Sequence, residues 1–238
     1  MDMGQAQGNE TTTIAVYEQT SPAVVTLSVG AGSGSGSIIG AQGLVVTNEH
    51  VVSFDPTQGI RVQTMAGGIY EGQVVAVDVV NDLALVQIIS GEVFPTVRLA
   101  GPGMTRVGQQ VFAIGSPFGL TGTLSTGILS RMAPNGDLQT SVMINLGSSG
   151  GPLLNSRGEL IGVNKEFVQS ADGGNVGISF ATSVDRVWEL VEHGFNAPQR
   201  ADIPTFGGHR LGIVVEVETL VVRQVDPGSV AEWHGIQV

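Results

Sequence analysis

Cysteine is absent from this sequence of 238 residues, and charged residues are scarce, at 13%. The lack of cysteine excludes disulfides, thiol catalysis and cysteine-based metal sites. Basic residues are few and scattered, and the net charge is −11, so nucleic acid is not an expected partner. Long apolar runs are also missing, so no membrane span is expected. Because apolar residues still make up 42% of the chain, the composition is typical of a folded protein with a substantial core.

Glycine, valine and isoleucine are abundant instead. Gly occurs 35 times, and β-branched residues form short runs separated by Gly, Pro, Asn or Asp. About ten such runs follow one another without a helix between them, which predicts an all-β fold, an antiparallel barrel or sandwich. The glycine- and serine-rich stretch 31–37 is interpreted as a flexible turn or linker. The predicted strands are 24–29, 37–40, 44–48, 60–65, 73–80, 83–89, 109–115, 124–130, 138–144, 159–164 and 176–181.

Helices are expected only at the two ends of this β-rich region. A short helix is predicted at 13–19, ending before Pro22, because the residue before a proline avoids the α region. A second helix is predicted at 184–193, where apolar residues recur at i, i+3, i+4 and i+7 between an N-cap at Ser183 and a C-cap at Gly194. The expected organisation is a mobile polar N-terminus at 1–11, a main domain at 12–196, a linker at 197–209 and a partial domain at 210–238.

The segment NLGSSGGPLLN at 145–155 places two serines among glycines. One interpretation is a plain turn, because Gly accepts positive φ and Ser hydrogen-bonds nearby backbone. The other is a loop that presents a nucleophile. Ser149 is then preferred over Ser148, because it is preceded by Gly-x and followed by Gly-Gly. In that case Gly147 would allow the turn, and the N–H groups of Gly147 and Ser149 would point at the developing oxyanion.

A serine hydroxyl needs a neighbouring base, and the candidate is His50. It is the only one of the four histidines within the β-rich region, at the exit of a strand in LVVTNEHVV. Most histidines are not catalytic, so a core or surface role stays open. The candidate for the orienting carboxylate is Asp82 in VNDLALVQI, at the start of an apolar strand. Asp78 is its competitor, and either residue could simply belong to a turn.

The order of these residues along the chain separates two classes of hydrolase. GSSGG also satisfies the G-x-S-x-G pattern of α/β-hydrolases, but there the order is Ser, acid, His and a helix follows the serine. Here the order is His50, Asp82, Ser149 on an all-β chain, which is the chymotrypsin-type arrangement. An α/β-hydrolase esterase would instead need a helix after Ser149 and a catalytic histidine late in the chain.

Five motifs in the same order resemble the HtrA/Deg family of serine endopeptidases: SGSGSIIGAQGLVVTNEHVV, NDLALVQI, AIGSPFGL, GSSGGPLLNSRGELIGVN and GNVGISFAT. The resemblance covers roughly residues 14–194. It implies a chymotrypsin-like double β-barrel and an ATP-independent endopeptidase that degrades unfolded or misfolded proteins, with no cofactor or metal. It also implies that His50 is the general base, Asp82 its orienting acid and Ser149 the nucleophile. The oxyanion hole would come from the backbone of Gly147, Ser148 and Ser149.

Three positions depart from the family pattern. Ser148 stands where Asn is common, Leu146 where Pro is common, and Ser141 where Asp is common. The segment 129–140 is also shorter than in many members of the family. The departure at Ser148 leaves a second interpretation open, a catalytically silent HtrA-like binding or chaperone protein whose oxyanion hole is not formed.

The resemblance extends beyond the protease region. Arg210, Leu211, Gly212 and Ile213 resemble the carboxylate-binding loop of a PDZ domain, and the rest of the tail resembles the start of that domain. Trimers built through N-terminal segments are common in the family, which predicts contacts from Tyr17 and Phe118. The resemblance implies a periplasmic or other extracytoplasmic location, although MDMGQAQGNE has no features of a signal peptide and a cytoplasmic location stays open.

Overall fold

The computed structural model divides the chain into two compact units, Met1–Ala197 and Pro198–Val238. The sequence analysis drew this boundary after residue 196. The residues that the structure describes are 3–55, 58–116, 122–169, 175–193, 213–216 and 221–225.

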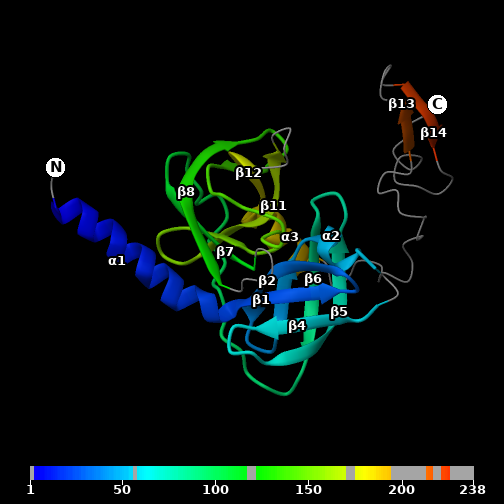
Figure 1. The fold of residues 1–238 in the computed structure, drawn as a ribbon, viewed down its shortest axis with the longest axis horizontal. Coiled ribbons are helices and arrows are strands. Elements are labelled where there is room, and N and C mark those ends of the chain that lie inside the picture. The colour runs from blue at the N-terminus through cyan, green and yellow to red at the C-terminus, as the bar shows by residue number, and fades with distance from the viewer. Residues whose placement is uncertain are drawn as a thin grey trace. The chain divides into compact units, whose positions relative to one another are not determined.

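The first half of unit 1 is a closed antiparallel barrel, drawn in blue and cyan in Figure 1. Side chains alternate between its core and solvent: along Ile60–Thr64, every second residue is buried. This period of two fits a strand with one face on a core. The strands follow the order β1-β2-β3-β6-β5-β4, and their bounds are β1 Val24–Val29, β2 Gly32–Gly40, β3 Leu44–Thr47, β4 Ile60–Thr64, β5 Ile69–Asp78 and β6 Leu83–Ile89.

The second half of unit 1 is another closed barrel, drawn in green and yellow in Figure 1. The two barrels confirm the all-β, chymotrypsin-like double-barrel prediction. Closure leaves neither sheet with an open edge. The order is β10-β11-β12-β9-β8-β7, and the bounds are β7 Gln110–Gly115, β8 Thr123–Met132, β9 Leu138–Thr140, β10 Pro152–Leu154, β11 Leu160–Gln169 and β12 Asn175–Ser183.

Strand β2 contains residues 32–37 of the stretch 31–37 that the sequence analysis interpreted as a flexible turn or linker. That interpretation was wrong except at Ala31, which lies in a turn. The glycines provide space for packing there. A Cβ on Gly34 would lie 2.6 Å from Val51 Cγ2, and one on Gly36 would lie 2.6 Å from Val45 Cγ1. Both distances are too short for real atoms, so these glycines let neighbouring elements pack directly on the strand.

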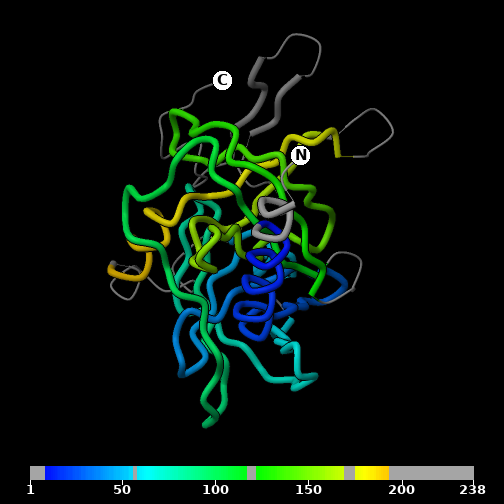
Figure 2. The backbone as a smooth tube through the Cα atoms, turned by 90° about the vertical axis from the view of Figure 1, so that its left-hand side faces the viewer, coloured from blue at the N-terminus to red at the C-terminus, as the bar shows by residue number. Residues whose placement is uncertain are grey.

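The helices are α1 Met3–Thr20, the short 3-10 turn η1 Ser21–Ala23, α2 Glu49–Val52 and α3 Val184–His193. Helix α1 begins at Met3, so the helix predicted at 13–19 extends through most of the segment that was expected to be mobile. Thr13 Oγ1 donates to the Asn9 carbonyl at 2.8 Å within this extension. Figure 1 shows α1 running away from the barrels, and Figure 2 shows it foreshortened, at an angle to the view. Its polar sequence carries no apolar period, which is why the sequence did not predict its full length.

Helix α3 has the predicted bounds. Val184 and Val187 are buried, and Trp188 Nε1 donates to the Ala100 carbonyl at 2.9 Å. None of the helices in the described part of the chain is long and apolar enough to cross a membrane.

Unit 2 contributes an antiparallel pair, β13 Ile213–Glu216 and β14 Val221–Val225. Ile213 of the predicted carboxylate-binding loop begins β13. The other three residues of that loop lie outside the described residues, and the PDZ-like segment stays a prediction.

Candidate active site

His50 and Asp82 lie in direct contact between α2 and the start of β6. His50 Nδ1 lies 2.7 Å from Asp82 Oδ2, and the His50 backbone N–H donates to Asp82 Oδ1 at 2.9 Å. The side chains are 24% and 14% exposed. Because an ionised carboxylate only accepts, the proton lies on Nδ1, and Nε2 is left as an acceptor. The imidazole is thus oriented to take a proton from a hydroxyl.

Asp82 is held in an unusual backbone conformation. Among the described residues it is the only non-glycine with positive φ, at 53°. The preceding turn fixes it there, because the Asp78 carboxylate accepts Asn81 N–H at 3.0 Å and Asn81 Nδ2 at 2.6 Å. Asp78, the competitor carboxylate, therefore shapes the turn and does not contact the histidine. Asp and Asn are the residues that tolerate the left-handed region best, so the NDL sequence carried a signal for this turn.

Two further residues of this site were missed by the sequence analysis. Asn48 Nδ2 donates to the Asp82 carbonyl at 2.8 Å, and Thr182 Oγ1, from the second barrel, donates to the Asn81 carbonyl at 2.9 Å. Both are polar and almost completely buried, with 0% and 1% exposed. They fix the backbone on either side of the acid, and Thr182 ties that turn to the other barrel. Neither has a sequence signal beyond its residue type.

Ser149 reaches the same region from the loop before β10. Gly34 lies between the two parts: a Cβ there would meet Val51, next to His50, and would lie 3.1 Å from the Ser149 carbonyl oxygen. The Ser149 carbonyl also accepts the Ser35 N–H at 2.8 Å. Among the described residues, no hydrogen bond joins the Ser149 hydroxyl to the imidazole. Such bonds are often long in structures without substrate.

The loop before Ser149 leaves two backbone N–H groups without an acceptor among the described residues. Gly147 has φ 95°, a value that favours glycine. The Ser148 N–H donates to the Asn145 carbonyl at 2.9 Å, so it is not available to a substrate. The N–H groups of Gly147 and Ser149 have no acceptor among the described residues. These two amides are therefore the candidate donors for an oxyanion, and Ser148 contributes through its position in the loop.

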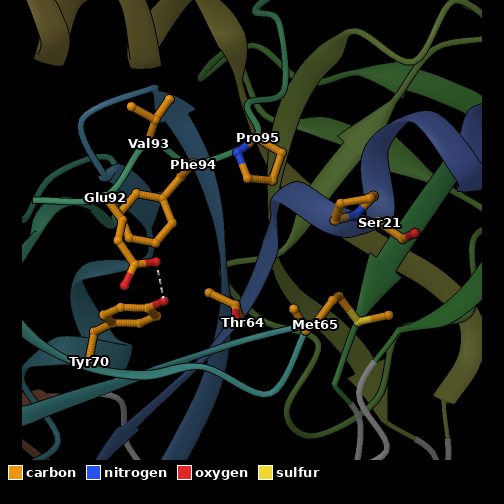
Figure 3. Close-up of a pocket in the computed structure, with 10 residues that line it drawn as sticks. Ser21, Thr64, Met65, Tyr70, Glu92, Val93, Phe94 and Pro95 are labelled. Carbon is orange, nitrogen blue, oxygen red and sulfur yellow. Dashed lines mark hydrogen bonds between the residues drawn. The ribbon is translucent and has the colours of Figure 1, made fainter. Parts of the chain in front are cut away.

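A pocket of about 410 Å³ lies on the first barrel, and its lining includes none of the predicted site residues. Figure 3 shows Tyr70 and Phe94 packed edge to face there, with ring centroids 5.2 Å apart. Tyr70 Oη donates to Glu92 Oε2 at 2.9 Å. That hydrogen bond raises the pKa of Tyr70, because ionisation would remove the donor and place two negative charges together.

Comparison with known proteins identifies relatives of this chain. Residues 34–163 match the family described as trypsin-like peptidase domain. The chain is 40% identical to the mitochondrial serine protease HTRA2 of Bos taurus over 201 residues, 75% of this chain and 42% of that protein. It is 38% identical to the periplasmic serine endoprotease DegP of Salmonella typhimurium over 223 residues, 86% of this chain and 46% of that protein.

A solved structure of the same family also resembles this chain. The crystal structure of Deg5 matches with a TM-score of 0.68 and 34% identity, covering 79% of this chain and 95% of the other. The present chain spans less than half the length of the two curated relatives. The double barrel, the matched domain and the near-complete coverage of Deg5 lead to one conclusion. The chain belongs to the HtrA/Deg family of serine endopeptidases, with a trypsin-like peptidase domain.

Proposed function

We propose that this chain is a serine endopeptidase in which Ser149 is the nucleophile, His50 the general base and Asp82 the acid that orients it. The observation that carries the proposal is the 2.7 Å contact between His50 Nδ1 and Asp82 Oδ2. It commits one ring nitrogen to the carboxylate and leaves the other to act on a hydroxyl. The meeting of this turn with the Ser149 loop at Gly34 supports the same assignment.

The reaction follows from these positions. Ser149 Oγ forms a bond to the peptide carbonyl carbon while His50 Nε2 takes its proton, and Asp82 stabilises the resulting imidazolium. The carbonyl oxygen becomes an oxyanion that accepts hydrogen bonds from the N–H groups of Gly147 and Ser149. His50 then gives its proton to the leaving amine as the peptide bond breaks. A water molecule then bonds to the acyl carbon while His50 takes its proton. The ester bond breaks to release the carboxylic acid, and His50 returns the proton to Ser149 Oγ.

The expected substrates are extended apolar segments of unfolded or misfolded proteins, cleaved without ATP. Apolar side chains are exposed on two connected segments beside the Ser149 loop: Met143 is 48% exposed, Leu146 65%, Val176 48% and Ile178 36%. Asn175 Nδ2 joins these segments by donating to the Ile144 carbonyl at 2.7 Å. An extended peptide could bind through its backbone and place a small-to-medium apolar residue there with little selectivity for sequence.

Location and assembly are further parts of this proposal. Relatives named mitochondrial and periplasmic support a compartment outside the cytoplasm. A homotrimer is expected from the family. Tyr17, one predicted contact, is half-buried and already packs against the core of its own chain, while Phe118 lies outside the described residues. Light scattering of the purified chain should give three chain masses, and a monomer across micromolar concentrations would overturn the trimer.

The test is labelling by a fluorophosphonate probe, together with digestion of casein, an unfolded substrate. The wild type should be labelled and should digest casein. Ser149→Ala and His50→Ala should lose both activities. Ser156→Ala, which removes an exposed serine hydroxyl in a turn after β10, should retain them. A folded wild type that binds casein but is neither labelled nor active would overturn the enzyme and favour the silent binding protein.

A further inference from the structure

We propose that Ser35, a buried residue of β2 in the first barrel, is a positioning residue that holds the oxyanion loop of the second barrel. The inference rests on the proposed function, because it concerns the amides that would receive the oxyanion. Ser35 touches no reacting atom. It acts through the peptide unit that joins Gly147 to Ser148.

Ser35 makes a set of contacts that uses every polar group it has. Its N–H donates to the Ser149 carbonyl at 2.8 Å, and its carbonyl accepts Thr47 Oγ1 at 2.7 Å. Its hydroxyl donates to the Gly147 carbonyl at 2.7 Å and accepts the Ser116 N–H at 3.0 Å. Because a carbonyl oxygen only accepts and a backbone N–H only donates, the hydroxyl proton must lie toward Gly147. The residue is 0% exposed, so water does not compete for these contacts.

These contacts hold one peptide unit at both ends. The carbonyl of Gly147 is bound by the Ser35 hydroxyl, and the N–H of the same peptide unit, on Ser148, is bound by the Asn145 carbonyl at 2.9 Å. Rotation of this unit would break both hydrogen bonds. It lies between the two candidate oxyanion donors, Gly147 N–H on one side and Ser149 N–H on the other. Fixing it therefore fixes the directions of both amides before substrate arrives, which is what electrostatic preorganisation requires.

The same strand also connects the loop to the base. Gly34, the preceding residue of β2, packs against Val51 next to His50. Gly34 therefore contacts the turn that carries the base, and Ser35, the next residue, contacts the loop that carries the nucleophile. A loss of the Ser35 hydroxyl should loosen the loop without disturbing the His50–Asp82 contact.

Ser37 provides a matched control two residues along the same strand. It is also 0% exposed, but its hydroxyl has no hydrogen-bond partner among the described residues. Ser35→Ala and Ser37→Ala therefore remove the same atom from equally buried positions, and only the first breaks contacts with the loop. Both variants keep their backbone N–H groups, so the hydrogen bond from the residue 35 N–H to the Ser149 carbonyl is retained.

The experiment measures two quantities on the full chain. The first is amide hydrogen exchange of the peptide that covers residues 145–151, which does not depend on catalysis. The second is kcat and KM on a short peptide substrate, with the rate of fluorophosphonate inactivation beside it. Ser35→Ala should exchange several-fold faster in this peptide and lose about tenfold in kcat, below the 10²–10³ typical when an oxyanion donor itself is deleted. KM should change less than twofold, and Ser37→Ala should match the wild type in all three.

The outcomes separate this inference from the proposed function. Equal exchange in Ser35→Ala and Ser37→Ala would overturn the inference, and so would faster exchange with an unchanged kcat in an active enzyme. A wild type without labelling or proteolysis would overturn the proposed function, and the exchange comparison would still decide whether Ser35 holds the loop. If Ser35→Ala does not fold, judged by circular dichroism, Ser35→Cys takes its place, because a thiol is close in size and a weak hydrogen-bond donor.

Discussion

Replacing Gly150 by alanine is expected to destabilise the protein by about 2–5 kcal/mol, through two additive costs. Gly150 has φ +85°, where an L side chain is strained, and this conformation costs about 1–2 kcal/mol. Its new Cβ would also overlap the Ser35 carbonyl oxygen and Thr47 Oγ1. Both residues are 0% exposed, so neither can move away, and overpacking of this kind adds about 1–3 kcal/mol.

Gly67 separates the two costs. Its φ is +88°, nearly the same as that of Gly150, but a Cβ on Gly67 meets nothing within 4 Å. Gly67→Ala therefore carries the backbone strain alone. A small entropic gain from the less flexible unfolded chain offsets part of that strain, so a net loss of about 1 kcal/mol is expected.

Urea unfolding followed by tryptophan fluorescence measures the difference. A Trp233→Phe background leaves Trp188 as the single tryptophan of the two in the sequence. Trp188 is half-buried in α3, hydrogen-bonded to Ala100, so its emission reports on the double-barrel unit. If Gly150→Ala unfolds at the same urea concentration as Gly67→Ala with an equal slope, the loop does not pack on β2 as described, and the reasoning fails.

Three further predictions follow from individual contacts. Asp82→Asn should lower kcat about 10⁴-fold, because an amide does not hold the imidazole in the required tautomer. The urea midpoint of this variant should stay close to that of the wild type. An unchanged kcat would show that Asp82 has no part in the mechanism. Glu159 has a pKa lowered from 4.5, first by the hydrogen bond from Arg157, so it stabilises the fold fully above pH 4.5 and loses that contribution as pH falls through its lower folded pKa. The unfolding midpoints of wild type and Glu159→Gln should therefore differ at neutral pH and converge in acid, and a gap that persists in acid would contradict this. Glu92→Gln should lower the pKa of Tyr70 back toward 10.0, which NMR titration of its ring signals would detect; an unchanged titration would contradict the hydrogen bond.

Most strands of the two barrels could be predicted from the sequence, but the residues at which several of them end could not. Strands 24–29 and 83–89 match β1 and β6 residue for residue, because each is a run of β-branched or other apolar residues between clear turns. The strand predicted at 138–144 ends at Thr140 instead. There Thr140 Oγ1 donates to the Ile128 carbonyl at 2.9 Å and accepts the Val142 N–H at 3.1 Å, so a side chain replaces the ladder. That competition depends on the neighbouring strand, which the local sequence does not contain.

Site residues whose role depends on a distinctive residue type could be predicted from the sequence, and residues that act through buried contacts could not. His50 and Asp82 stand out because few other residues could serve, and the structure brings them into contact. Ser35 was hidden in a stretch whose composition is typical of a linker. Glycine and serine there serve close packing and buried hydrogen bonds across two barrels, and a periodicity argument has no access to contacts between residues more than a hundred positions apart.

The division of the predicted catalytic residues between the barrels has a consequence for biosynthesis. The base and the acid both belong to the first barrel, the nucleophile enters only with the second, and Thr182, which ties the acid turn across, lies near the end of the last barrel strand. Under the proposed mechanism, a nascent chain that contains only the first barrel has the base and the acid but lacks Ser149. If these roles hold, proteolysis by the growing polypeptide begins only after nearly the whole double barrel has been translated.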